Sequence, residues 1–151
     1  MPEATLWRYD HRYLGEQALP EDQPVLRPMV TVSAPGLAEE YEALVDSGSP
    51  ISIANSELFG KFGIDLSVDE PLYVVPMGIG GVFARIAVFE VELDLVPPPT
   101  IVVPAVKWRL HLGSRTNWRM PFSVLLGQRG WFDQFPTTID RTATTVHLPQ
   151  D

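Results

Sequence analysis

Residues 41–55 read YEALVDSGSPISIAN, an apolar run that stops at a single acid and becomes apolar again after three small residues and a proline. The apolar residues 43–45 predict the buried end of a strand. Asp46 therefore lies where that strand stops, with its backbone held by the fold and its side chain at the strand end. The question is what a lone carboxylate does in that place.

The residues that follow the acid can all support a carboxylate. Gly48 allows its backbone N–H to approach the carboxylate closely. The hydroxyls of Ser47 and Ser49 can donate to the carboxylate or to neighbouring backbone groups. Asp, Ser and Gly are also the commonest turn residues, so a tight turn without any chemical role is the alternative interpretation of these letters alone.

Composition limits the possible classes of protein. The chain has 151 residues, of which 45% are hydrophobic and 20% charged, as expected for one globular domain. A net charge of −8 argues against nucleic acid or an anionic membrane as a partner. The chain has no Cys, which excludes disulfides and thiolate metal sites. It also lacks both a long apolar segment and an apolar signal sequence, so we expect a cytoplasmic protein without a membrane segment.

The periodicity predicts a mainly β fold with one or two short helices. Residues 24–45 indicate a hairpin that turns at Pro35-Gly36 and delivers the acid. Residues 54–66 predict a short helix that Asn55 or Ser56 caps and Gly63 ends. Two further β runs flank the glycine-rich segment 77–81, and in the second run apolar residues alternate with Glu90, Glu92 and Asp94, which we interpret as a solvated face.

The remaining segments are less regular. Residues 1–24 are expected to be an N-terminal arm, although Trp7 and Tyr9 also fit an early strand. Residues 97–120 begin with three consecutive prolines, which favour an extended connection before another strand. They end in a stretch rich in cations, which fits the lip of a groove, a subunit contact or a solvated loop. This stretch contains Lys107, Arg109, Arg115 and Arg119.

These motifs together resemble the retropepsin-like aspartic proteases, which carry one Asp-Ser/Thr-Gly motif per chain. Residues 44–48 match the active loop, and VLLGQRGWF at 124–132 resembles the second signature that crosses behind it. MGIGGVF at 77–83 resembles the glycine-rich tip of the flap, and ELFGKFGIDL at 57–66 resembles the small helix of bacterial members. Ser47 and the following Ser-Pro depart from the retroviral pattern, as does the Arg-Gly pair at 129–130, where an Asp is frequent.

The resemblance implies a closed β-barrel domain over residues 25–151, with residues 97–120 as an insertion. It also implies the roles of individual residues. The catalytic group would be Asp46, Ser47 and Gly48, and the loop would be supported by Ser49, Leu125, Leu126 and Gly127. The substrate would be covered by Met77, Gly78, Ile79, Gly80, Gly81 and Val82.

Hydrolysis by this chemistry needs two carboxylates in contact that share one proton. The chain has a single Asp-Ser-Gly, so one copy supplies half a site. We therefore expect a homodimer in which Asp46 faces its own copy across a two-fold axis. No cofactor or metal is expected, because the three histidines are isolated and no cysteine is present.

Three functions remain open on the sequence alone. The first is an aspartic endopeptidase that acts as a homodimer on extended, mainly apolar peptides. The second is a catalytically silent dimer of the same fold that binds a peptide or a partner protein in the groove between subunits. The third is an unrelated β-barrel module in which VDSGS is only a turn.

Overall fold

The long strand β8 (Val82–Val96) organises the fold, which is seen here in a computed structural model that describes residues 5–13, 26–79 and 81–148. Its residues Phe89, Val91, Leu93 and Leu95 are buried, whereas Glu90, Glu92 and Asp94, which alternate with them, are exposed or half-buried. Strand β9 (Val106–Arg115) pairs antiparallel with β8 from Ala87 to Leu95. The predicted period-2 alternation is confirmed, and it directs one face of β8 into the core.

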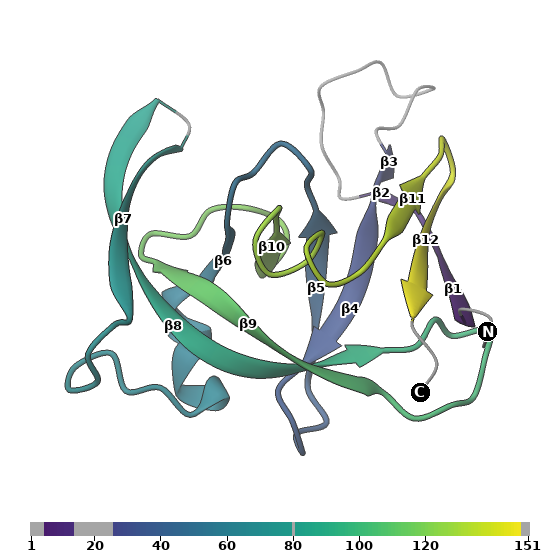
Figure 1. Cartoon of the computed structure of the whole chain (residues 1–151), viewed down its shortest axis with the longest axis horizontal. Coiled ribbons are helices and arrows are strands. Elements are labelled where there is room, and N and C mark those ends of the chain that lie inside the picture. Colours follow the sequence, from purple (N-terminus) through teal and green to yellow (C-terminus); the bar gives the residue numbers. More distant parts are fainter. Residues whose placement is uncertain (1–4, 14–25, 80, 149–151) are drawn as a thin grey trace.

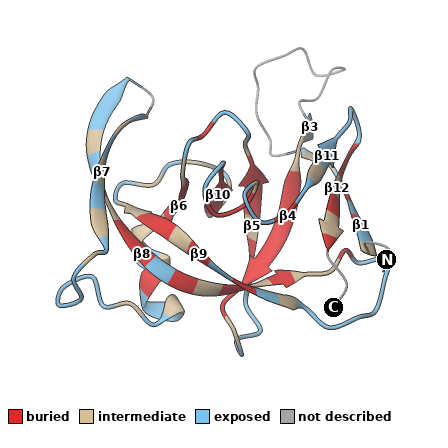
Figure 2. Cartoon of the chain, in the orientation of Figure 1, coloured by how far each residue is buried: buried red, intermediate tan, exposed pale blue. Residues whose placement is uncertain are grey.

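Six strands close a barrel (Figure 1). The main sheet runs in the order β4-β5-β10-β6-β9-β8-β7, and an additional pairing of β4 with β8 closes the ring, so that β7 stays outside it. The buried residues of Figure 2 concentrate on the barrel strands, while residues 73–78 of β7 alternate between half-buried and exposed. The other members of this sheet are β4 (Met29–Ser33), β5 (Glu40–Val45), β6 (Ser52–Asn55), β7 (Tyr73–Ile79) and β10 (Val124–Leu126).

The hairpin that leads to Asp46 is present as predicted. Strands β4 and β5 are antiparallel, with Val32 opposite Tyr41, and the chain turns at residues 35–36. Gly36 has a positive φ of 79°, a backbone conformation that favours glycine. All five residues of β4 are buried, so this hairpin is fixed to the core before the chain reaches the acid.

The predicted helix is a 3-10 helix, η1 (Ser56–Phe62). The Asn55 side chain accepts a hydrogen bond from the backbone N–H of Glu57, and Gly63 ends the helix with a φ of 83°. Phe59 is fully buried and makes an edge contact with Phe89 of β8. Both predicted caps are confirmed, and η1 covers one end of the barrel core.

A second sheet packs beside the barrel in the order β1-β12-β11. Of the two interpretations of the N-terminal region, residues 5–10 form the strand, since β1 (Thr5–Asp10) pairs antiparallel with β12 of the same chain. Trp7 and Tyr9 are buried in the barrel's own core, and the Tyr9 hydroxyl donates to the Val96 carbonyl at 2.6 Å. The remaining strands are β2 (Arg12–Tyr13), β3 (Leu26–Arg27), β11 (Thr137–Ile139) and β12 (Ala143–Leu148).

The stretch 97–120 divides into parts with different structures. Residues 97–105 lie outside the strands, as their prolines predict. Residues 106–115 form β9, which pairs with both β6 and β8 and is therefore a strand of the barrel. Among the described residues, no helix is both long enough and apolar enough to span a bilayer.

Tyr9 generates a prediction about stability at alkaline pH. Burial raises the pKa of Tyr9, so above pH ~10 the unfolded chain ionises this phenol more readily than the folded chain does. The stabilisation by Tyr9 is present below that pH and is lost as the pH rises. We expect Tyr9→Phe to lower the free energy of unfolding by about 1 kcal/mol at neutral pH. The difference in this free energy between the variant and the native chain should narrow at pH ~10.5. Urea unfolding at both pH values tests this, and a gap that widens at alkaline pH would contradict it.

Candidate active site

The acid-bearing loop is held by a strand that passes between its two ends. β10 pairs parallel with β5, which precedes the loop, and antiparallel with β6, which follows it. The Asp46 N–H donates to the Leu126 carbonyl at 2.9 Å. The acid therefore takes its position from the register of a buried sheet, with Leu44 and Val45 opposite Leu125 and Leu126.

Gly127 makes this crossing possible. A Cβ added at Gly127 would lie 2.6 Å from the Ser49 carbonyl oxygen and still closer to the Ile51 carbonyl oxygen. Backbone atoms cannot move aside as a flexible side chain can. Only glycine therefore fits where β10 passes under the acid loop, which is the physical reason for a glycine in the second signature.

The carboxylate of Asp46 is half-buried and accepts the N–H of Gly48 on Oδ1 at 2.9 Å. This is the contact that the sequence predicts for Gly48. The Ser49 hydroxyl donates to the Ile51 carbonyl at 2.7 Å, which is the backbone alternative of its two predicted partners. Ser47 is exposed, and its carbonyl accepts a hydrogen bond from the Gln128 side chain at 2.7 Å.

Further bonds that the sequence does not reveal fix the same loop. The Ser52 hydroxyl accepts from the Gly127 N–H at 3.0 Å and donates to the Arg129 carbonyl at 2.9 Å. The N–H groups of Gln128 and Arg129 donate to the carbonyls of Ser49 and Pro50. Each bond joins residues more than 70 positions apart, so no pattern of neighbouring residues predicts these bonds.

Strands β7 and β8 form the hairpin expected from the glycine-rich segment. Their ladder runs from Tyr73 opposite Val88 to Ile79 opposite Val82, and Gly81 has a φ of 80°. Gly80 and the side chain of Ile79, both predicted to cover substrate, lie outside what the structure describes. Figure 1 shows this hairpin standing out from the barrel on the side of the acid loop.

A cleft of about 290 Å³ joins the acid loop to this hairpin. It brings together eight residues around the acid, of which Met77 and Gly78 come from β7. Leu126 and Gly127 are buried behind the loop, and Val82 is exposed outside this cleft. Asp46 is the one ionisable residue among those that line it. The lining residues are Asp46, Gly48, Ser49, Pro50, Ile53, Met77, Gly78, Met120 and Leu125.

Ile53 and Met120 are site residues that sequence reasoning missed. Met120 falls at the end of a stretch interpreted as an insertion, and Ile53 reads as an ordinary core residue. Both belong to a small apolar cluster around Ile53, Ile86 and Val88, separate from the main core. An apolar floor beside a carboxylate suits a peptide with apolar side chains.

The base of the hairpin is tied to the acid loop by polar contacts. The Tyr73 hydroxyl lies 2.9 Å from His111 Nδ1 of β9, and Arg129 Nη1 donates to the same hydroxyl at 3.4 Å. This hydrogen bond to Tyr73 raises the pKa of the Arg129 guanidinium above its usual value. Because the Arg129 backbone is bonded to the acid loop, its side chain links that loop to β7.

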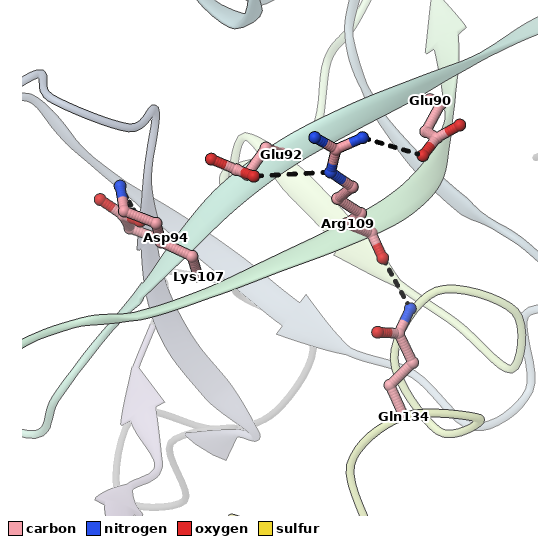
Figure 3. Close-up of polar contacts among 6 residues, drawn as sticks. All are labelled: Glu90, Glu92, Asp94, Lys107, Arg109 and Gln134. Atoms are coloured by element: carbon pink, nitrogen blue, oxygen red, sulfur yellow. Dashed lines mark hydrogen bonds and ion pairs between the residues drawn. The ribbon is translucent and has the colours of Figure 1, made fainter.

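The predicted cluster of cations separates into two groups. Lys107 and Arg109 face outward on β9 and lie across from the carboxylates of β8, with Lys107 3.4 Å from Asp94 (Figure 3). Arg109 lies 3.7 Å from Glu90 and 3.6 Å from Glu92. These carboxylates thus form an ion-pair ladder that is exposed at Glu90 and Glu92 and partly buried at Asp94. The described residues contain no group of three or more His, Cys, Asp or Glu side chains arranged to hold a metal ion.

Comparison with known proteins supports the fold of the chain. No protein-family model matches the chain, and no curated protein matches it. Among solved structures, it is similar to a retropepsin-like aspartic protease from Rickettsia conorii, with a TM-score of 0.57 and 11% sequence identity. The match covers 98% of this chain and 96% of that one.

The predicted fold class is therefore confirmed: the chain has the retropepsin-like fold, mainly β, with a closed barrel and one short helix. The third hypothesis is wrong in its fold, because the match to a retropepsin-like structure covers 98% of the chain, whereas the role of VDSGS is a separate question.

Gly127 provides a test of the site's construction. We expect Gly127→Ala to destabilise the protein by about 3 kcal/mol or more, because the new methyl group meets two carbonyl oxygens. Gly60→Ala is the matched control, since nothing lies within 4 Å of a Cβ at that position. Thermal unfolding of both variants measures the difference. Equal melting temperatures for the two variants would show that β10 does not pass as closely as described.

Proposed function

We propose that this protein is an aspartic endopeptidase that works as a homodimer. The observation that carries the proposal is the placement of Asp46, whose carboxylate accepts the Gly48 N–H at 2.9 Å in a cleft shared with the β7–β8 hairpin. The retropepsin-like fold supports it, because the acid occupies the loop that the fold positions between β5 and β6.

The second carboxylate of the reaction would come from a partner copy. The cleft of one chain contains a single acid, and no other described carboxylate lines it. A two-fold arrangement would place two copies of Asp46 together, where both cannot ionise readily and one proton is shared. Ser47 and Gly48 of each chain would keep the pair in position.

The steps of peptide hydrolysis follow from the proton that the two carboxylates would share. The ionised carboxylate takes a proton from water as the oxygen attacks the peptide carbonyl, and the protonated carboxylate donates its proton to the carbonyl oxygen. The tetrahedral intermediate then collapses, with a proton passing to the leaving nitrogen. The β7–β8 hairpin would act as the flap, closing over an extended peptide and excluding water that is not needed for attack.

Asp46→Asn tests the reaction. We expect the native chain to cleave apolar peptides between pH ~4 and ~7, and the variant to lose about a thousandfold or more in rate. An amide can neither take the proton from water nor share one with its copy. Asp10→Asn, the same chemical change on the exposed end of β1, is the control and should retain activity. Cleavage by the Asp46→Asn protein would exclude this mechanism.

The dimer is tested separately by sedimentation. We expect the mass to rise toward two chains as concentration increases, and Asp46→Asn to dimerise as well as the native chain does. A strict monomer at high concentration would exclude both the endopeptidase and the silent binding dimer. A proven dimer that cleaves no peptide would favour the binding alternative.

A further inference from the structure

A groove of about 700 Å³ runs along β8 beside the candidate flap. Its walls come from β8, from the end of β9 with the residues that follow, and from the loop before β7. We call it the arginine groove, because Arg85, Arg115 and Arg119 line it. It is larger than the cleft at Asp46, and the proposed reaction does not account for it.

The arginine groove adjoins the cleft at Asp46 on the β7–β8 hairpin, although no residue lines both. Met77, which lines the cleft, is directly opposite Ala84, which lines the groove, so the two side chains lie on one face of the hairpin. Met120 of the cleft adjoins Arg119 of the groove in sequence. Arg85 follows Ala84 and points to the other face of β8, so a peptide that leaves the cleft would meet the arginines after crossing the edge of this strand.

The charges of this groove are unbalanced. Within the described residues, no ion pair or hydrogen bond is made by the side chains of Arg85, Arg115 or Arg119. Asp69 is the one carboxylate among the lining residues. On the outer ladder of the barrel, by contrast, Lys107 and Arg109 do have carboxylate partners. Three unpaired guanidinium groups in a chain of net charge −8 favour an anionic ligand.

The edge of β8 along the groove is open to pairing. The ladder with β9 begins only at Ala87, so residues 82–86 pair with β7 on one side and with no described strand on the other. Open strand edges accept extended peptides through backbone hydrogen bonds, while side-chain pockets select the residue type. This observation favours a peptide over a small anion.

We infer that the arginine groove is a specificity subsite for acidic side chains of an extended peptide substrate. This inference rests on the proposed function, since the peptide is the one that Asp46 would cleave. A guanidinium fork binds a carboxylate through two parallel hydrogen bonds, which a neutral amide cannot reproduce. In a two-fold dimer each subunit brings one arginine groove, so acidic residues are selected on both sides of the cleaved bond.

The test is a binding measurement with Asp46→Asn, which leaves the peptide intact. Two fluorescent peptides of about ten residues share an apolar centre and carry either Glu or Gln toward both ends. We expect the Glu peptide to bind about tenfold more tightly, and the preference to shrink as salt rises from ~50 to ~500 mM. Changing Arg85, Arg115 and Arg119 to Gln in that protein should abolish the preference. Arg141→Gln, an exposed arginine in the β11–β12 turn, is the matched control and should keep it.

Each result has a defined meaning. Equal binding of the two peptides, binding of neither, or a preference that survives the triple substitution overturns the inference. A cleavage assay with the native chain distinguishes a failure of the inferred subsite from a failure of the proposed function. If the native chain cuts both peptides equally and the variant binds them equally, the endopeptidase stands and the subsite is wrong. If the arginine-dependent preference is seen but no peptide is cut, the groove binds acidic peptides and the endopeptidase is wrong.

Discussion

The passage of β10 between β5 and β6 is the constraint on which the rest of the site depends. It brings the Leu126 carbonyl to the N–H of Asp46 and lays Gly127 against the carbonyls of the acid loop. A loop on a protein surface usually varies in position because few bonds hold it. Here both ends of the loop pair with one buried strand, so the sheet fixes the position of the carboxylate.

The parts of the fold that were predictable are those encoded by neighbouring residues. Alternation of apolar and polar residues places β8, and Asn55 and Gly63 give the ends of the helix because capping is a local interaction. The contact between Gly48 and Asp46 was equally predictable, since one residue separates the two in sequence. The helix itself is 3-10 rather than α, as suits a segment of seven residues.

The rest of the site depends on pairs that are distant in sequence. The parallel pairing of β6 with β9, the Ser52 bonds and the contribution of Met120 to the cleft all join segments whose association only the closed barrel determines. The arrangement of the cations could not be predicted for the same reason. Residues 107–119 look uniform in sequence, yet the ladder on β9 neutralises two of the four cations and Arg115 and Arg119 turn to a groove.

Strand β8 has a mechanical consequence for the molecule. Its first residues belong to the hairpin over the acid, and its last residues pair with β4, whose other neighbour β5 carries Asp46. The hairpin has no separate hinge at its base, because the same strand continues unbroken into the barrel wall. Bending the hairpin therefore displaces a backbone that continues into the barrel wall beside β4, so the position of the hairpin and the support of the acid loop are mechanically connected.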